Sequence, residues 1–383
     1  MSTSTRIVAA LAVALAAGSA AAQAPKLPPS LTMSAYDTGS NGFNQAVAVG
    51  GMLKKRFSTD LRVLPAGNDV ARLAPLKAGR AQASAMGIGT FFAQEGVFEF
   101  ASPDWGPQPV QLILSASTCS GQSLGVAADA GVKTAADLKG KRAGFVVGSP
   151  AINQSTMALI AFGGWTTDDV KVVEFASYGA MMKGVSNGEI DIFFASTISG
   201  LAKEIDSSPR GVKWVPMPAS DKEGWARLQK IGPYFYPHTA TCGAGIAQGE
   251  KVETAVYPYP IFMAYGTQDE QTIHALTRAM LMHYDDYKDA VTGVDGLEGK
   301  RQNLQWTMPY HAGAVKALKE AGIWTDAAQK HNDALMKRQQ VLADAWKAFQ
   351  ATKPAGDAAQ FREAWMKARS AALTAAGMDV LFN

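Results

Sequence analysis

Two short loops carry glycine and small polar residues at places where helices are expected to begin. Residues 38–42 are Thr-Gly-Ser-Asn-Gly and residues 148–150 are Gly-Ser-Pro, and each loop follows a short apolar run. Glycine permits a tight turn, and the backbone N–H groups of a helix start attract a carboxylate or another anion. Glycine turns after strands are also common in purely structural roles, but two of them facing each other across a cleft predict a site for a small acidic solute. The candidate contacts are Gly39, Ser40, Asn41, Ser149 and Asn153.

Three further residues could contribute to such a site. Arg72 is expected one turn into a helix that begins at Asn68, where it could grip a carboxylate with two hydrogen bonds or form an ion pair within the protein. Ser196 follows an apolar strand, at the end where open α/β sheets bind their ligands. Tyr236 belongs to an aromatic cluster that could line a pocket or pack at the edge of the core. If Arg72 contacts the solute, its replacement by alanine should weaken binding at least tenfold, on the order of 1.4 kcal/mol.

Signatures of catalysis and of metal binding are not found in the chain. It lacks H-E-x-x-H, G-x-x-x-x-G-K-[ST], G-x-S-x-G and the calcium-loop pattern, and its five histidines are scattered. We therefore expect no cofactor, no metal and no enzymatic activity. An enzyme on a similar two-lobed fold is the alternative, and it would need a nucleophile or an acid–base pair in the cleft. The net charge of +3 and the absence of a basic stripe predict no nucleic-acid partner.

The first 24 residues have the pattern of a signal peptide. Arg6 precedes an apolar run from residue 7 to residue 17, and small residues follow with possible cleavage after Ala22 or Ala24. The run is shorter than the roughly 20 residues of a membrane-spanning helix, so we expect export to the periplasm with cleavage rather than an uncleaved anchor. In that oxidising compartment Cys119 and Cys242 could form a disulfide or remain two buried thiols. We expect the mature protein to be a monomer.

Short apolar strands alternate with helical patterns through most of the chain, which predicts an α/β fold with mostly parallel sheets. The pattern repeats at an offset of 109 residues. This offset carries Gly39-Ser40 onto Gly148-Ser149, Asn44 onto Asn153 and Gly79 onto Gly188. We interpret the repeat as two similar α/β lobes, in line with a mature length of about 360 residues, which exceeds one compact core.

The lobes and their connections can be assigned along the sequence. Residues 25–118 form the first part of lobe 1, residues 119–245 form lobe 2, and residues 246–324 return to lobe 1. The chain should cross between the lobes at residues 115–121 and 242–256. Residues 325–383 are expected to be amphipathic helices packing on the lobes, because apolar residues recur there at helical spacing. These apolar residues are Leu335, Leu342, Trp346, Phe349, Phe361, Trp365, Ala368 and Ala372.

Three segments resemble one family of binding proteins. They are Tyr-Asp-Thr-Gly-Ser-Asn-Gly at 36–42, Gly-Val-Lys-Thr-Ala-Ala-Asp-Leu-Lys-Gly-Lys at 131–141, and Pro-Tyr-His-Ala-Gly-Ala at 309–314. Together with the leader they resemble the TAXI family, the TRAP-associated extracytoplasmic solute receptors. The middle segment is shared by many type II periplasmic binding proteins and supports the fold only, whereas the outer two are more specific.

The resemblance implies a two-lobed fold of periplasmic binding protein type II, a Venus flytrap, here with added C-terminal helices. It also implies a small organic acid ligand, such as an amino acid or a dicarboxylate, and delivery to the membrane subunits of a TRAP transporter. The sequence departs from the family pattern after Gly42 and in residues 67–72, both expected ligand contacts, so glutamate is not carried over as the ligand. A receptor for an ABC importer or a sensor kinase is the alternative within the same class.

Overall fold

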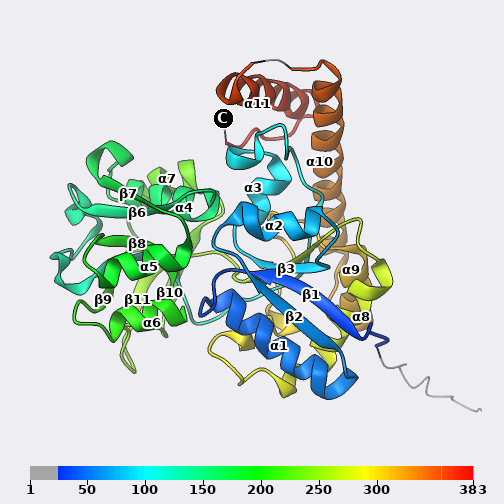
Figure 1. Ribbon diagram of the computed structural model, residues 1–383, viewed down its shortest axis with the longest axis horizontal. Coiled ribbons are helices and arrows are strands. Elements are labelled where there is room, and N and C mark those ends of the chain that lie inside the picture. The colour runs from blue at the N-terminus through cyan, green and yellow to red at the C-terminus, as the bar shows by residue number, and fades with distance from the viewer. Residues whose placement is uncertain (1–24, 355, 383) are drawn as a thin grey trace, which may run out of the picture.

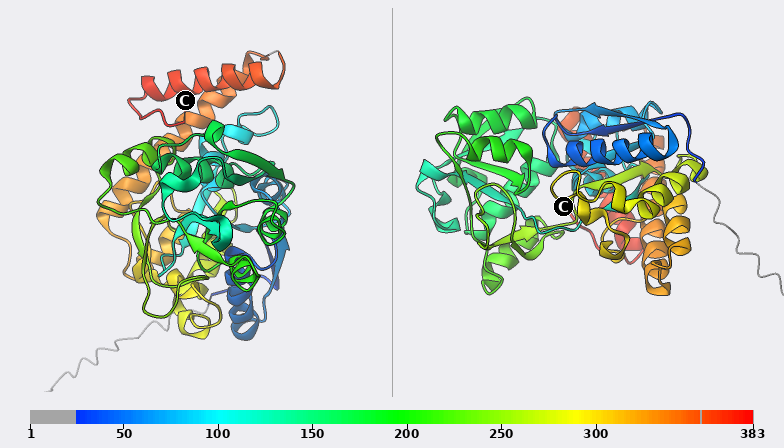
Figure 2. Two further views of the ribbon diagram at one scale, coloured as in Figure 1. Left: turned by 90° about the vertical axis from the view of Figure 1, so that its left-hand side faces the viewer. Right: turned by 90° about the horizontal axis from the view of Figure 1, so that it is seen from below.

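The computed structural model describes residues 25–354 and 356–382, and the expected signal peptide at 1–24 lies outside this range. Two α/β lobes lie side by side, and a pair of C-terminal helices extends from one of them (Figures 1 and 2). Lobe 1 has a five-stranded sheet in the order β2-β1-β3-β12-β4. Its strands are β1 (Ser30–Ala35), β2 (Asp60–Pro65), β3 (Ala83–Met86), β4 (Val110–Ser115) and β12 (Ile261–Tyr265). Its helices are α1 (Asn41–Phe57), α2 (Asp69–Lys77), α3 (Gly89–Glu95), α8 (Glu270–Met282) and α9 (Ala312–Glu320).

Lobe 2 has a second five-stranded sheet in the order β7-β6-β8-β5-β9. Its strands are β5 (Gln122–Ala127), β6 (Arg142–Val146), β7 (Lys171–Phe175), β8 (Ile192–Ser196) and β9 (Val212–Trp214). Its helices are α4 (Pro150–Phe162), α5 (Tyr178–Ser186), α6 (Gly200–Asp206) and α7 (Lys222–Ile231). Short 3-10 helices occupy connecting loops of both lobes: η1 (Phe98–Phe100), η2 (Ala128–Ala130), η3 (Ala135–Leu138), η4 (Thr167–Asp169), η5 (Tyr284–Asp286), η6 (Val294–Leu297) and η7 (Gly299–Arg301).

The two sheets have the same topology, which confirms the interpretation of two similar lobes. In each, three parallel strands are followed by a strand that runs antiparallel to them, β12 in lobe 1 and β5 in lobe 2. The glycines that coincide at the 109-residue offset also share a conformation: φ is +89° at Gly39 and +73° at Gly148, and +67° at Gly79 and +76° at Gly188. Only glycine adopts these left-handed angles without strain, so the repeated glycines mark the same turns in both lobes.

Local signals account for several helix starts. Asn68 caps α2 by accepting a hydrogen bond from the backbone N–H of Ala71, as expected, and Ser40 caps α1 in the same way from Phe43. Thr134 forms a capping box with Asp137 at the predicted short helix η3. The loops of residues 38–42 and 148–150 lie between β1 and α1 and between β6 and α4.

The chain crosses twice between the lobes. Residues 116–121 lead from β4 to β5, and residues 257–260 lead from β11 (Val252–Val256) to β12. Strand β11 pairs with β10 (Tyr236–Ala240), and its Glu253 carbonyl accepts a hydrogen bond from Met217 of lobe 2. The return to lobe 1 therefore follows Val256 and does not begin at residue 246 as expected, because the β10–β11 ribbon belongs with lobe 2. A disulfide joins Cys119 in the first crossing to Cys242 beyond β10, with 5.6 Å between the Cα atoms.

The C-terminal helices α10 (Asp326–Ala351) and α11 (Ala358–Ala375) pack on lobe 1 beside α3 (Figure 1). Phe349, Phe361 and Trp365 form a small apolar cluster with Ala101 of lobe 1. The buried Glu95 at the end of α3 accepts hydrogen bonds from Arg338 of α10 and Arg369 of α11. The apolar spacing predicted the helices and their packing face, but it did not predict this ion-pair anchor.

Candidate functional site

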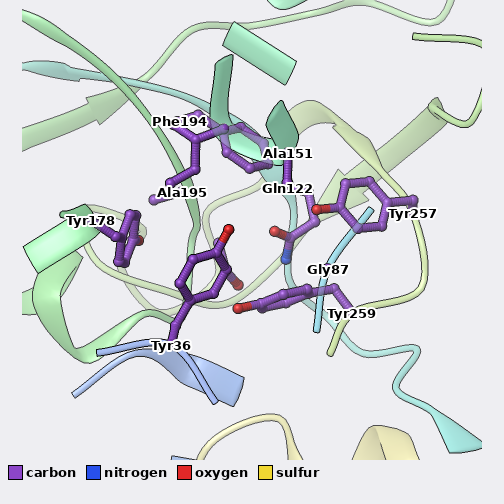
Figure 3. Close-up of a pocket in the computed structure, with 11 residues that line it drawn as sticks. Tyr36, Gly87, Gln122, Ala151, Tyr178, Phe194, Ala195, Tyr257 and Tyr259 are labelled. Carbon is purple, nitrogen blue, oxygen red and sulfur yellow. The ribbon is translucent and has the colours of Figure 1, made fainter. Parts of the chain in front are cut away.

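A buried cavity lies where the two lobes meet at the chain crossings (Figure 3). The space open to the centre of a water molecule is about 20 Å³. One bound water needs roughly 10–15 Å³ of such space. In this closed arrangement the cavity therefore accommodates a group of water size, and a larger solute requires the lobes to close less tightly around it. The lining residues are Tyr36, Gly87, Gln122, Ala151, Ile152, Tyr178, Phe194, Ala195, Ser196, Tyr257 and Tyr259.

The lining residues come from strand ends and helix starts. Tyr36 and Gly87 directly follow β1 and β3 in lobe 1, and Ser196 ends β8 in lobe 2. Ala151 and Tyr178 lie in the first turns of α4 and α5. The carboxyl ends of parallel strands and the N-termini of the following helices thus meet at the cavity, which is where open α/β sheets usually bind ligands.

Two buried polar groups in the cavity wall have no hydrogen-bond partner within the described part of the chain. They are the Gln122 amide nitrogen and the Ser196 hydroxyl. Both residues are almost completely buried, at 2% and 4% exposure. A buried polar group without a partner costs about 1–3 kcal/mol, so such groups are usually satisfied by something in the site. Gln122 and Ser196 are therefore the side chains most suited to hold a solute.

Tyrosines form much of the remaining wall. Burial raises the pKa of each of them, so they are neutral phenols at physiological pH; they are Tyr36, Tyr178, Tyr257 and Tyr259. The charge of Arg72 and a hydrogen bond from the Gly42 backbone lower the pKa of Tyr259 and so partly offset burial. A hydrogen bond from the Ile88 backbone lowers the pKa of Tyr257 in the same way. Since each of these two hydroxyls accepts a backbone N–H, each can donate its own proton into the cavity. Figure 3 shows Tyr36, Gln122 and Tyr259 pointing toward one another.

Arg72 and Ser149 do not line the cavity. Arg72 is completely buried, pairs with Asp69 and lies 3.1 Å above the ring of Tyr36. The Ser149 hydroxyl donates to the same Asp69 carboxylate at 3.1 Å. We expected Arg72 to bind a ligand carboxylate. In this structure its guanidinium instead pairs with the carboxylate of Asp69, three residues earlier on the same helix. The ion pair that the sequence left open for Arg72 is the arrangement found.

The other predicted contacts have different positions. Ser196 lines the cavity, and its contact with a solute stays a prediction. Ser40 and Asn41 are buried at the start of α1 but do not line it, and Asn41 accepts a hydrogen bond from Gln45. Gly39 lies at a lobe–lobe contact, with Leu201 of lobe 2 next to it.

Asn153 and Tyr236 also lie outside the cavity wall. The side chain of Asn153 makes two hydrogen bonds to the backbone of Val146, within lobe 2. Tyr236 is 38% exposed at the start of β10. Tyr257 and Tyr259 alternate with prolines in a loop, a pattern that is compatible with a pocket wall, and Tyr36 belongs to the motif at 36–42. Gln122 carried no sequence signal, because a single glutamine at the start of a strand is common.

No group of three or more His, Cys, Asp or Glu side chains in residues 25–354 and 356–382 is arranged to hold a metal ion. Over the same part of the chain, no helix has the length and apolar character needed to cross a membrane.

Two lobes with matching sheets of this strand order, joined by two crossings with a cavity between them, define the fold of a type II periplasmic binding protein. The chain belongs to the NMT1-like family, whose model matches residues 83–322. A comparison with curated proteins gave no match.

Similar solved structures include three binding proteins. The alkanesulfonate-binding protein of Xanthomonas axonopodis pv. citri, bound to MOPS, has 15% identity and a TM-score of 0.41, over 84% of this chain and 93% of that one. The periplasmic aliphatic sulphonate binding protein of Escherichia coli has 14% identity and a TM-score of 0.40, over 87% and 91%. An ancestral arginine-binding protein bound to arginine has 15% identity and a TM-score of 0.41, over 71% and 97%.

Proposed function

We propose that this protein is an extracytoplasmic solute receptor that binds a small solute between its two lobes without chemical turnover. The observation that carries the proposal is the pair of buried, unpartnered groups, Gln122 and Ser196, in a cavity at the lobe interface. Gln122 and Ser196 form the lobe 2 wall of the cavity, and Tyr36 and Gly87 belong to the lobe 1 wall. A solute that contacts both walls does so only when the lobes close around it. Such a solute stabilises the closed state because it binds that state better than the open one.

The solute is a small organic acid, such as an amino acid or a dicarboxylate. The cavity wall is rich in hydrogen-bond donors: the Gln122 amide, the Ser196 hydroxyl and the phenols of Tyr257 and Tyr259. None of the described residues that line it is acidic. Neutral donors facing a buried space suit the oxygens of a carboxylate, and the absence of a lining acid avoids repulsion between like charges.

The partner is the membrane part of a TRAP-type transporter, and the protein works in the periplasm. The resemblance of the segments at 36–42 and 309–314 to TAXI receptors supports this partner. The Cys119–Cys242 disulfide supports an oxidising compartment. An ABC importer or a sensor kinase is the alternative, and the genes adjacent to this one distinguish the three, since each partner has its own characteristic membrane subunits.

Solute binding is tested by a thermal-shift screen of the mature protein with small organic acids and amino acids, followed by calorimetry. The protein is first unfolded and refolded to remove any bound solute. A solute at about 100 times its dissociation constant should stabilise the fold by roughly 2.7 kcal/mol. Mass spectrometry of the recovered solute should show it unchanged. No shift with any compound would contradict the proposal, and chemical conversion of a bound compound would favour an enzyme.

Gln122→Leu tests the site directly. The substitution removes the unpartnered amide while keeping a similar volume, so solute affinity should fall at least tenfold, about 1.4 kcal/mol. The free energy of unfolding without solute should be unchanged or higher, because a buried donor without a partner is lost. Gln271→Leu, at an exposed position of α8, is the matched control and should bind normally. Equal affinities of both variants would remove Gln122 from the site.

A further inference from the structure

The Asp69 carboxylate of lobe 1 is held by groups from both lobes. Asp69 lies in the first turn of α2 and is completely buried. From lobe 2 it accepts hydrogen bonds from the backbone N–H of Ala151 at 2.7 Å and from the Ser149 hydroxyl at 3.1 Å. From lobe 1 it accepts a hydrogen bond from the Tyr36 hydroxyl at 2.8 Å and pairs with Arg72. One carboxylate thus receives donors from both sides of the lobe interface.

These donors form an anion-binding site. The N–H of Ala151 belongs to the first turn of the 13-residue helix α4, where exposed N–H groups and the helix dipole favour negative charge. The guanidinium of Arg72 adds a buried positive charge, and its Nε atom has no hydrogen-bond partner in the described structure although the side chain is completely buried. A helix start, a hydroxyl and an arginine converge on the same carboxylate, as they would on an acidic ligand.

A second contact repeats the pattern. Asp37 of lobe 1 accepts a hydrogen bond from the backbone N–H of Gly179 at 2.7 Å, in the first turn of α5. Beside it, the N–H of Tyr178 donates to the Gly67 carbonyl of lobe 1 at 3.0 Å. The starts of two helices of lobe 2 therefore each face a carboxylate of lobe 1.

We infer that Asp69 is an internal ligand: the protein's own carboxylate fills the anion site formed by Arg72 and the start of α4, and so holds the lobes closed without a solute. Asp37 supports the same closed state at α5. The solute's carboxylate consequently binds at Gln122 and Ser196, and not at Arg72. The latched cavity holds only a group of water size, so the lobes must loosen before a larger solute enters. A favoured, nearly closed state still reduces the conformational cost of closing around that solute.

We call the contact of Asp69 with Arg72, Ser149 and Ala151 the latch. Amide hydrogen exchange of the wild-type protein tests it without any mutation. In solute-free protein, unfolded and refolded as above, the amides of Ala151 and Gly179 should exchange at least about 100-fold more slowly than in an unstructured chain, as expected if the open state is near 1%. Unprotected amides at both positions would overturn the inference. The measurement needs no solute, so a failure of the receptor proposal and a failure of the latch are separate results.

Chemical rescue tests the role of the carboxylate. Asp69→Ala should expose the anion site and open the lobes, which increases the radius of gyration in small-angle scattering and lowers the protection of Ala151 at least tenfold. Formate has the size of the deleted group, so sodium formate should restore both readouts, whereas sodium chloride at equal ionic strength should not. The matched control Asp60→Ala removes an exposed carboxylate that pairs with Lys54, and it should behave as wild type.

Either of two results would contradict the inference: an Asp69→Ala protein as compact as wild type, or one that opens and does not respond to formate. If Asp69→Ala fails to fold, Ser149→Ala gives the alternative measurement. This substitution removes only one hydrogen-bond donor to Asp69, at the interface between the lobes. The protection of Ala151 should then fall while the protection of α4 residues within the lobe 2 core stays unchanged, and equal protection at Ala151 would overturn the latch.

Discussion

Among single residues, Arg72 and Asp69 have the largest energetic consequence for the lobe interface. Both side chains are completely buried, and each is the nearest opposite charge of the other. A buried charge is tolerated only with a partner, so a buried ion pair is sensitive to the loss of either member. Arg72 therefore acts through Asp69, and its contribution to solute binding is indirect.

Arg72→Ala should destabilise the protein by about 3–5 kcal/mol, because it leaves the Asp69 carboxylate buried without a cation. Urea denaturation of the solute-free protein measures the change. Arg62→Ala is the control, since Arg62 is exposed on β2 and its removal should change the free energy of unfolding by less than about 0.5 kcal/mol. Similar stabilities of the two variants would show that Asp69 has another counter-ion.

Among the elements, α10 and α11 depend on one acidic residue of α3. Burial would raise the pKa of Glu95, but hydrogen bonds and charges from Arg338 and Arg369 outweigh it and hold the pKa below its usual value of 4.5. The Trp365 indole adds a hydrogen bond to the Gly96 carbonyl next to it. The two C-terminal helices are thus attached to lobe 1 by a charged centre inside an apolar cluster.

Glu95→Gln should cost about 3 kcal/mol at pH 7, because it leaves the buried Arg369 and the partly buried Arg338 without their carboxylate. The folded pKa is depressed, so the stabilisation from Glu95 is complete above the unfolded pKa near 4.5 and is lost as the pH falls toward the folded pKa. The stability difference between wild type and variant should therefore shrink below pH 4.5. Urea unfolding at pH 7, 5 and 4 measures it, with Glu363→Gln on the exposed face of α11 as control. A difference that stays constant with pH would contradict this role.

For the molecule as a whole, closure depends on how closely the two lobes approach. Gly200 begins α6 of lobe 2, and a Cβ atom there would lie 2.6 Å from the backbone oxygen of Gly39 in lobe 1. Such a distance is too short for any side chain, and a backbone oxygen cannot move aside as a flexible side chain can. Glycine is therefore needed at this position in the closed state and not within lobe 2 itself.

Gly200→Ala should fold normally but favour open lobes. We expect a larger radius of gyration in small-angle scattering and at least a tenfold loss of solute affinity, since less of the protein is in the binding-competent state. Gly51→Ala is the matched control, because a Cβ atom at Gly51 in α1 meets no atom within 4 Å. A Gly200→Ala protein with wild-type dimensions and affinity would show that the lobes close less tightly in solution.

The sequence predicted much of the fold because its signals are local. The cap at Asn68, the glycine turns at the 109-residue offset and the apolar face of α11 each depend on a few neighbouring residues. The candidate site was predicted less well. Of the eight proposed contacts only Ser196 lines the cavity, and Gln122 was missed. The Asp69–Arg72 pair could be predicted from the sequence, because residues three apart on a helix are neighbours.

Local patterns were sufficient to predict the two-lobed α/β architecture, because strand and helix periodicity, caps and left-handed glycines act over a few residues. Which groups meet between the lobes depends on how the lobes pack. Asp69 and Ala151 are 82 positions apart, and their hydrogen bond exists because lobe 2 docks on lobe 1 in one orientation. Groups from different lobes show no characteristic spacing in the sequence, because only the packing of the lobes brings them together.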